Sequence, residues 1–185
     1  MDKVPSTVDG ERFDGPFQRP VTYKYICYSG SLTRLKDGVD ILINSFAKMS
    51  ASFTDINLLL AGRADTARMI NSFGIVVESS DLADRVIFTG KLSRNAIPPY
   101  LCNAEILALA RPRSIVAAAG FPSKVSEYLA SGKPVVVTSV GEIPEYLADN
   151  VNAFSSEPDS VDAFAERMTF VLENRTHARE VGIKW

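Results

Sequence analysis

The chain of 185 residues is 46% hydrophobic and 23% charged, and its formal net charge is −2. This length corresponds to one globular domain, because domains usually contain roughly 100–200 residues. The slightly acidic balance argues against a broad nucleic-acid-binding surface, since such domains tend towards a pI above ~9. No apolar run approaches the roughly 18 residues of a membrane span, and the N-terminus lacks the apolar centre of a signal peptide. We therefore expect a cytoplasmic protein with no transmembrane segment and no nucleic-acid partner.

The cysteines and the single histidine limit the chemistry that the chain can carry. Cys27 and Cys102 both lie in apolar surroundings, which is typical of reduced core thiols rather than of a disulfide or a metal site. His177 is the only histidine, which excludes a histidine-rich zinc site and disfavours a Ser-His-Asp triad.

Residues 1–20 are polar and interrupted by prolines, and we expect them to form a lead-in or inter-domain linker. After them, short apolar and β-branched runs predict strands. The expected strands are 24–29, 56–61, 86–89, 106–110, 134–138 and 152–154. Apolar residues at helical spacing, together with proline in a first turn and glycine after a last turn, predict helices. The expected helices are 39–49, 66–79, 97–103, 123–131, 143–147 and 161–173.

Strands that alternate with helices indicate crossover connections and therefore a mostly parallel sheet. The runs INLLLA (56–61) and PVVVT (134–138) show no polar alternation, so we expect helices to cover both of their faces. The predicted fold class is α/β, a Rossmann-like parallel sheet with helices on both faces. In such sheets, ligands bind beyond the carboxyl ends of the strands.

Glycines and cations collect where the predicted strands end. Glycine lets backbone N–H groups approach an anion, and a cation neutralises it. This combination predicts an anionic, phosphate-bearing ligand, while the alternative is that these are ordinary polar loops. The residues concerned are Gly30, Ser31, Arg34, Lys36, Gly38, Gly62, Arg63, Gly90, Lys91, Arg111 and Arg113.

The helix expected from Ser123 onwards carries the most specific signal. Its first turn has unpaired backbone N–H groups and the positive end of the helix dipole, where Lys124 is unfavourable unless an anion lies close by. Glu127 shares a helical face with Lys124, and its carboxylate is placed to accept hydrogen bonds from a ribose diol. The alternative is a salt bridge between Glu127 and Lys124 on a solvated face. Val125 and Leu129 are expected to point into the core.

Taken together, these segments resemble the carboxyl-terminal half of the group 1 glycosyltransferases of the GT-B fold. The resemblance runs nearly from end to end, and its most specific part is 120–147. The segments that carry it are VDGERFDGP, YSGSLTRLKDGVDILINSFAKM, LLLAGRAD, RVIFTGKLSRNAIPPYLCNAEILALARP, GFPSKVSEYLASGKPVVVTSVGEIPEYL and NAFSSEPDSVDAFAERMTFVLEN.

The resemblance implies a catalytic group of three residues. Lys36 matches the lysine that neutralises the donor diphosphate. The family usually has arginine where Ser31 stands, and Arg34 in the same loop is the expected substitute. Glu127 matches the second glutamate of the family's Glu-x7-Glu motif, which holds the ribose, whereas Ala119 replaces the first, which contacts the donor sugar.

The resemblance also implies a set of donor-binding residues. Ser123 and Lys124 match the helix start beside the diphosphate, and the turn that includes Lys91 and Leu92 matches the lining of the base pocket. The lost glutamate implies that the sugar is recognised differently here, by Arg111 or by the backbone around Gly120. The full expected set is Gly30, Ser31, Lys91, Leu92, Arg111, Gly120, Phe121, Ser123 and Lys124.

By resemblance, the reaction is retaining transfer of a hexose-type sugar from a nucleotide diphosphate sugar to an acceptor hydroxyl in polysaccharide biosynthesis. It needs no metal and no cofactor, and the acceptor is a glycan or a lipid-linked molecule. Residues 21–175 would form the donor-binding domain and 176–185 a truncated tail. The N-terminal acceptor domain would have to be supplied in cis or in trans, so we expect the chain alone not to transfer sugar. A full-length enzyme could lie peripherally at a membrane.

Three alternatives remain at this point. An inactive nucleotide-sugar-binding or interaction domain of the same fold would account for Ala119 and Ser31. A sugar-nucleotide epimerase shares the fold, but the paired histidines expected in it are missing. A dinucleotide oxidoreductase would show a GxGxxG motif after a strand, and none is present.

Overall fold

The computed structural model describes residues 8–63, 82 and 84–183. In this part of the chain, six strands form one sheet in the order β3-β2-β1-β4-β5-β6. Every neighbouring pair is parallel. The strands are β1 (Lys24–Ser29), β2 (Ile56–Ala61), β3 (Val86–Gly90), β4 (Ile106–Leu109), β5 (Val135–Thr138) and β6 (Phe154–Ser156). The predicted fold class is therefore confirmed.

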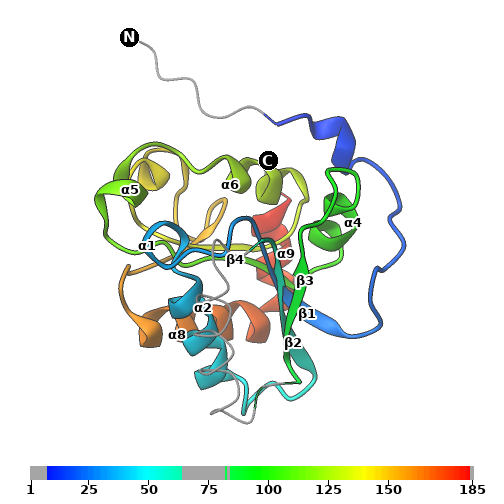
Figure 1. Ribbon diagram of the computed structural model, residues 1–185, viewed down its shortest axis with the longest axis horizontal. Coiled ribbons are helices and arrows are strands. Elements are labelled where there is room, and N and C mark those ends of the chain that lie inside the picture. The colour runs from blue at the N-terminus through cyan, green and yellow to red at the C-terminus, as the bar shows by residue number, and fades with distance from the viewer. Residues whose placement is uncertain (1–7, 64–81, 83, 184–185) are drawn as a thin grey trace.

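Helices cover both faces of this sheet. The chain moves from β1 through α2 (Val39–Met49) to β2 in one direction, and from β3 through α4 (Ile97–Cys102) to β4 in the other. Since such crossovers are right-handed, the two helices lie on opposite faces. Helix α8 (Val161–Glu173) returns to the face of α2 and packs beside it (Figure 1). Helix α6 (Ser123–Ala130) connects β4 to β5 and so lies on the face of α4.

Burial explains why the central strands were predictable. All four residues of β4 and of β5 are buried, and β2 has one partly exposed residue, Asn57. The apolar runs thus fill both faces of the sheet, as expected for parallel strands under helices. The predicted positions of Val125 and Leu129 are also confirmed, because both side chains lie on the buried face of α6.

Four short elements were not expected from the sequence. In the lead-in, a 3-10 helix (η1, Gly10–Phe13) places Phe13 in the core at 7% exposure. Helices α1 (Arg34–Asp37) and α5 (Ile115–Ala118) form single turns in segments for which no helix was predicted. Helix α9 (Arg175–Gly182) replaces most of the predicted tail and buries Ala178 and Val181. The three elements of a single turn, η1, α1 and α5, are too short to show a helical periodicity in the sequence.

The other bounds agree closely with expectation. The last predicted strand, 152–154, is shifted to Phe154–Ser156, while helix α7 (Ile143–Tyr146) lies where it was predicted. The predicted helix 66–79 lies outside the described residues. Among the helices that the structure describes, none is both long enough and apolar enough to cross a membrane.

Candidate functional site

A cavity of about 720 Å³ opens beyond the carboxyl end of β1, beside the first turn of α6. The strand order reverses between β1 and β4, and in open parallel sheets this switch point is where ligands bind. The volume lies within the usual range for small-molecule sites, roughly 300–1,000 Å³. The cavity is lined by Val8, Asp9 and Arg12 of the lead-in, by Ser29, Gly30, Ser31, Thr33, Lys36 and Asp37 after β1, by Arg94 and Ile97, and by Ser123, Lys124 and Glu127 of α6.

Glycine allows the backbone to approach closely at two points around this cavity. A Cβ on Gly30 would lie 2.5 Å from the Nζ of Lys124, and the φ of Gly30 is +149°. A Cβ on Gly38, between α1 and α2, would lie 1.9 Å from the carbonyl oxygen of Ala110. Only glycine therefore lets the loop after β1 lie against both α6 and the end of β4.

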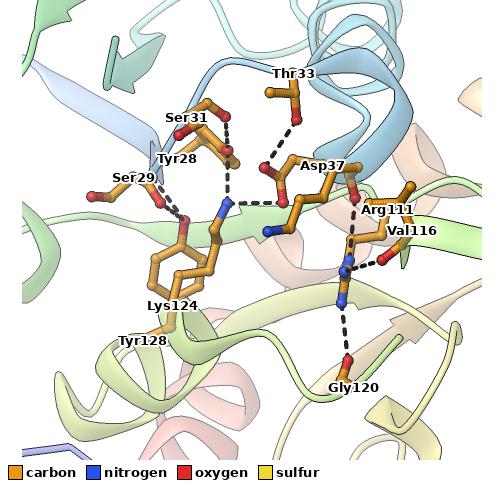
Figure 2. A network of polar contacts seen from close by, with 11 residues as sticks. Tyr28, Ser29, Ser31, Thr33, Asp37, Arg111, Val116, Gly120, Lys124 and Tyr128 are labelled. Carbon is orange, nitrogen blue, oxygen red and sulfur yellow. Dashed lines mark hydrogen bonds and ion pairs between the residues drawn. The ribbon is translucent and has the colours of Figure 1, made fainter. Parts of the chain in front are cut away.

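Lys124 extends from the first turn of α6 into a cluster of oxygen atoms. Its Nζ lies 2.9 Å from Asp37 Oδ1 and donates a hydrogen bond of 2.8 Å to the hydroxyl of Tyr28 (Figure 2). The Tyr28 hydroxyl in turn donates to the carbonyl of Ser31. Burial lowers the pKa of Lys124 below its ordinary value, and the charge of Asp37 partly opposes this.

Asp37 is the anion nearest to this lysine. Its side chain is 2% exposed, and its Oδ2 accepts a hydrogen bond of 3.1 Å from Thr33. Within the described chain, Oδ1 accepts no hydrogen bond, so its contact with Lys124 is an ion pair without hydrogen-bond geometry. The sequence analysis expected a bound anion to compensate the charge of Lys124. In this structure the carboxylate of Asp37 lies beside Lys124 and compensates its charge from within the protein.

Glu127 lies one helical turn beyond Lys124 and lines the same cavity. Its Oε1 accepts a hydrogen bond of 3.0 Å from Nη1 of Arg12, which belongs to η1 in the lead-in. The alternative of a salt bridge between Glu127 and Lys124 is not what the structure shows, because the two side chains pair with Arg12 and Asp37. Lys36, Lys124 and Glu127, which the sequence analysis singled out, therefore all line one cavity.

Tyr128 fixes α6 against the end of β1. Its hydroxyl accepts a 2.8 Å hydrogen bond from the backbone N–H of Ser29 and lies 3.3 Å from the carbonyl of the same residue. The side chain is fully buried, and this burial raises its pKa well above the ordinary value. The neutral phenol therefore acts as a rigid connection between the helix and the strand.

Six of the expected site residues do not line the cavity. Arg34 is exposed and pairs with Asp40 at 2.9 Å. Arg111 is 1% exposed, and its guanidinium donates to the carbonyls of Lys36 at 3.2 Å and Gly120 at 3.4 Å, so it connects loops instead of facing the cavity (Figure 2). Burial lowers the pKa of Arg111. The other four are Lys91, which is exposed, Leu92, which packs against the core, Gly120, and Phe121, which stacks edge-on against Tyr146.

Sequence reasoning missed Arg12, Tyr28 and Asp37. Arg12 was missed because the lead-in was interpreted as a linker, although the bulky Phe13 in a polar segment was a signal that it packs. Asp37 follows Lys36 directly, and an acidic residue inside a basic loop was the available signal. Tyr28 lies in a segment that was predicted as a strand and given no role in the site.

Comparison with protein-family models places the chain in a family. Residues 23–174 match the family of group 1 glycosyl transferases. No curated protein matches the chain. The solved C-terminal domain of the group 1 glycosyl transferase LpcC from Francisella tularensis is similar, with a TM-score of 0.82 at 21% identity over 95% of this chain and 93% of that one.

Two longer solved proteins have a similar fold. Anabaena HepE, solved in complex with UDP and glucose, gives a TM-score of 0.76 at 21% identity over 87% of this chain. Sucrose-phosphate synthase from Thermosynechococcus elongatus gives 0.72 at 22% identity over 86%. The chain spans 42% and 39% of these two proteins, respectively. The fold is that of one half of a GT-B glycosyltransferase, and by its sequence match the chain belongs to the group 1 glycosyl transferases.

Proposed function

We propose that this chain binds the nucleotide-sugar donor for a retaining hexosyl transfer to an acceptor hydroxyl. The observation that carries the proposal is that Lys36, Lys124 and Glu127 line a single cavity at the switch point of the sheet. A similar fold in Anabaena HepE was solved with UDP and glucose, which supports a uridine or related nucleotide as the ligand class.

The diphosphate would lie between Lys36 and the start of α6. Lys36 is exposed at the cavity, and within the described residues its side-chain ammonium group has no hydrogen-bond or ion-pair partner. Pro122, which precedes α6, offers no side-chain cap, so the first N–H groups of the helix are available to an anion. As the glycosidic bond breaks, negative charge grows on the leaving phosphate, and these preorganised positive groups would stabilise it.

The ribose would lie against Glu127. Arg12 contacts only Oε1 of this carboxylate, and within the described chain Oε2 has no hydrogen-bond partner. An ionised carboxylate accepts hydrogen bonds only, so it matches the two hydroxyl donors of a ribose diol. Lys124 and Glu127 are three residues apart on α6. The rise between them along the helix is about 4.5 Å, which suits adjacent phosphate and ribose groups.

We further propose that the transfer needs neither a metal nor a cofactor, because Lys36 and Lys124 supply the positive charge that a metal would otherwise bring to the diphosphate. A second domain, supplied in cis or in trans, would hold the glycan or lipid-linked acceptor. The much longer relatives support this division, because the chain spans less than half of HepE.

A thermal-shift panel with uridine, guanosine and adenosine diphosphates and their sugars tests the binding. A ligand at 100 times its Kd stabilises the folded state by about 2.7 kcal/mol. One nucleotide series should raise the melting temperature in the presence of EDTA. No shift with any nucleotide would contradict the proposal.

A second candidate is a domain that binds nucleotide sugars without transferring them. The observations that favour it are Ala119 and Ser31, which stand where the family has a sugar-contacting glutamate and an arginine. A transfer assay with radiolabelled donor and extracts containing the second domain distinguishes the candidates, since only an enzyme produces labelled glycan.

A further inference from the structure

Arg12 lies in the lead-in but is held by three separate contacts at the cavity. Its Nη1 donates to Glu127 at 3.0 Å, and its Nη2 donates to the carbonyl of Arg94 at 2.7 Å. The guanidinium also lies 5.6 Å from the ring centroid of Phe13, which is buried in the core. Its side chain is 16% exposed.

These contacts join three distant parts of the chain. Arg12 and Glu127 are 115 residues apart, and Arg12 and Arg94 are 82 apart. The contact with Arg94 uses a backbone carbonyl, so it does not move when side chains rotate. Phe13 anchors η1 to the body of the domain. Because both terminal nitrogens of the planar guanidinium are hydrogen-bonded, the Arg12 side chain is held in one orientation.

Arg12 acts on one oxygen of Glu127. Because Oε1 is held, rotation of the carboxylate is restricted, and Oε2 is the atom left to accept from a ligand. Without Arg12, Glu127 could turn towards Lys124 on the same helical face.

We propose that Arg12 is a positioning residue that fixes Glu127 for the ribose diol, and that ligand binding at Glu127 is thereby coupled to the seating of residues 8–13 on the domain. This inference rests on the proposed function. The coupling is reciprocal, because any ligand that binds more tightly when Arg12 is in place must also stabilise Arg12 in its place.

The first experiment measures dissociation constants by calorimetry for three probes on the full chain. The probes are the tightest-binding of uridine, guanosine and adenosine diphosphate, its 2′,3′-dideoxy analogue, and inorganic diphosphate. Arg12→Ala should weaken the nucleoside diphosphate by about 10- to 100-fold, the range for a charge-assisted hydrogen bond. Binding of the dideoxy analogue and of inorganic diphosphate should change by less than about twofold.

Matched variants separate positioning from loss of structure. Arg12→Lys keeps the charge but not the two-pronged contact, so it should restore part of the affinity. Arg19→Ala removes an exposed cation of the same lead-in outside the cavity and should leave all three constants unchanged. Combined with Glu127→Gln, Arg12→Ala should add little further loss, because the two residues act on the same ribose contact.

The second readout is hydrogen exchange of the backbone amides in residues 8–13. The nucleoside diphosphate should slow this exchange in the wild-type chain, whereas inorganic diphosphate should not. Equal weakening of all three probes by Arg12→Ala overturns the inference and leaves the proposed function standing. If the wild-type chain binds none of the probes, both are overturned.

Discussion

The cavity holds two ion pairs that differ in their burial. The pair of Lys124 and Asp37 is deep, with side chains 16% and 2% exposed, whereas the pair of Arg12 and Glu127 lies at the rim, with 16% and 26%. Removing one member of a buried pair leaves an uncompensated charge out of water, and this penalty decreases as the pair becomes more accessible to water. We infer that the deep pair supports the fold and the rim pair serves the ligand.

The deep pair also explains how the protein tolerates Lys124 at a helix start. The carboxylate of Asp37 stands beside the Nζ at the place where the first turn of α6 favours an anion. A diphosphate that approaches Lys124 must therefore compete with a charge belonging to the protein. Asp37 should therefore affect both the stability of the fold and the affinity for an anion. Substitutions of Asp37 and Lys124 can separate these two effects.

The largest expected effect comes from Lys124→Ala. Because Asp37 is 2% exposed, its charge would be left buried without a partner, and the free energy of unfolding should fall by about 3–5 kcal/mol. Urea denaturation measures this. Lys48→Ala, which breaks the exposed pair with Asp162, is the control and should lower the stability by no more than about 1 kcal/mol.

A double variant tests whether the buried charge of Asp37 causes this loss. A carboxylate that is 2% exposed is costly to bury without a countercharge, whereas an amide of the same shape carries no charge. Adding Asp37→Asn to Lys124→Ala should recover most of the loss at neutral pH. An equal loss in the double variant would show that the missing charge is not the cause.

Features of the fold and the site that depend on local sequence could be predicted, whereas contacts between residues far apart in the chain could not. Strands β1 and β2 were predicted with their observed bounds. The aromatic and β-branched residues of β1 favour a strand, and the continuous apolar run of β2 is typical of a parallel strand buried on both faces. The convergence of Lys36 and Lys124 followed from the rule that strand ends meet at one edge. These features depend on local sequence and topology.

The ion-pair partners were not predictable in the same way. Arg12 and Glu127 are 115 residues apart, and no periodicity in the sequence connects them. Asp37 was hidden because α1 is a single turn whose direction is set by packing on α5 and by the close approach of Gly38 to β4. Such pairings depend on side-chain direction, which only the folded chain determines.

Asp37→Asn should act oppositely on stability and on binding. It removes the negative charge beside Lys124, so the affinity for inorganic diphosphate should rise by about tenfold, the effect of roughly 1.4 kcal/mol at a partly solvated site. Calorimetry with inorganic diphosphate measures this, and urea denaturation should show a lower stability in the same sample. Weaker binding by this variant would mean that Asp37 orients Lys124 for the anion instead of competing with it.

The pH dependence of anion binding should report Lys124 itself. Burial places its pKa below the ordinary value of 10.5, and a bound anion would raise it again. Binding is then strongest where Lys124 is protonated in the free protein, and it weakens as the pH rises through that lowered pKa. Titrations with inorganic diphosphate between neutral and alkaline pH test this. In Lys124→Ala the same alkaline decline should be reduced.

The smallest effect is expected from Arg34, and it tests how far the loop after β1 serves the cavity. Lys36 lines the cavity, so Lys36→Ala should weaken a nucleoside diphosphate several-fold, about 1 kcal/mol, and should weaken a monophosphate less. Arg34 faces Asp40 outside the cavity, so Arg34→Ala should change either affinity by less than about twofold. Each substitution removes one positive charge from the same helical turn. The two variants therefore differ mainly in the direction of the side chain that is removed. Equal losses for both variants would show that the ligand senses the charge of the whole loop; unequal losses would show that the side-chain direction seen here decides which cation binds.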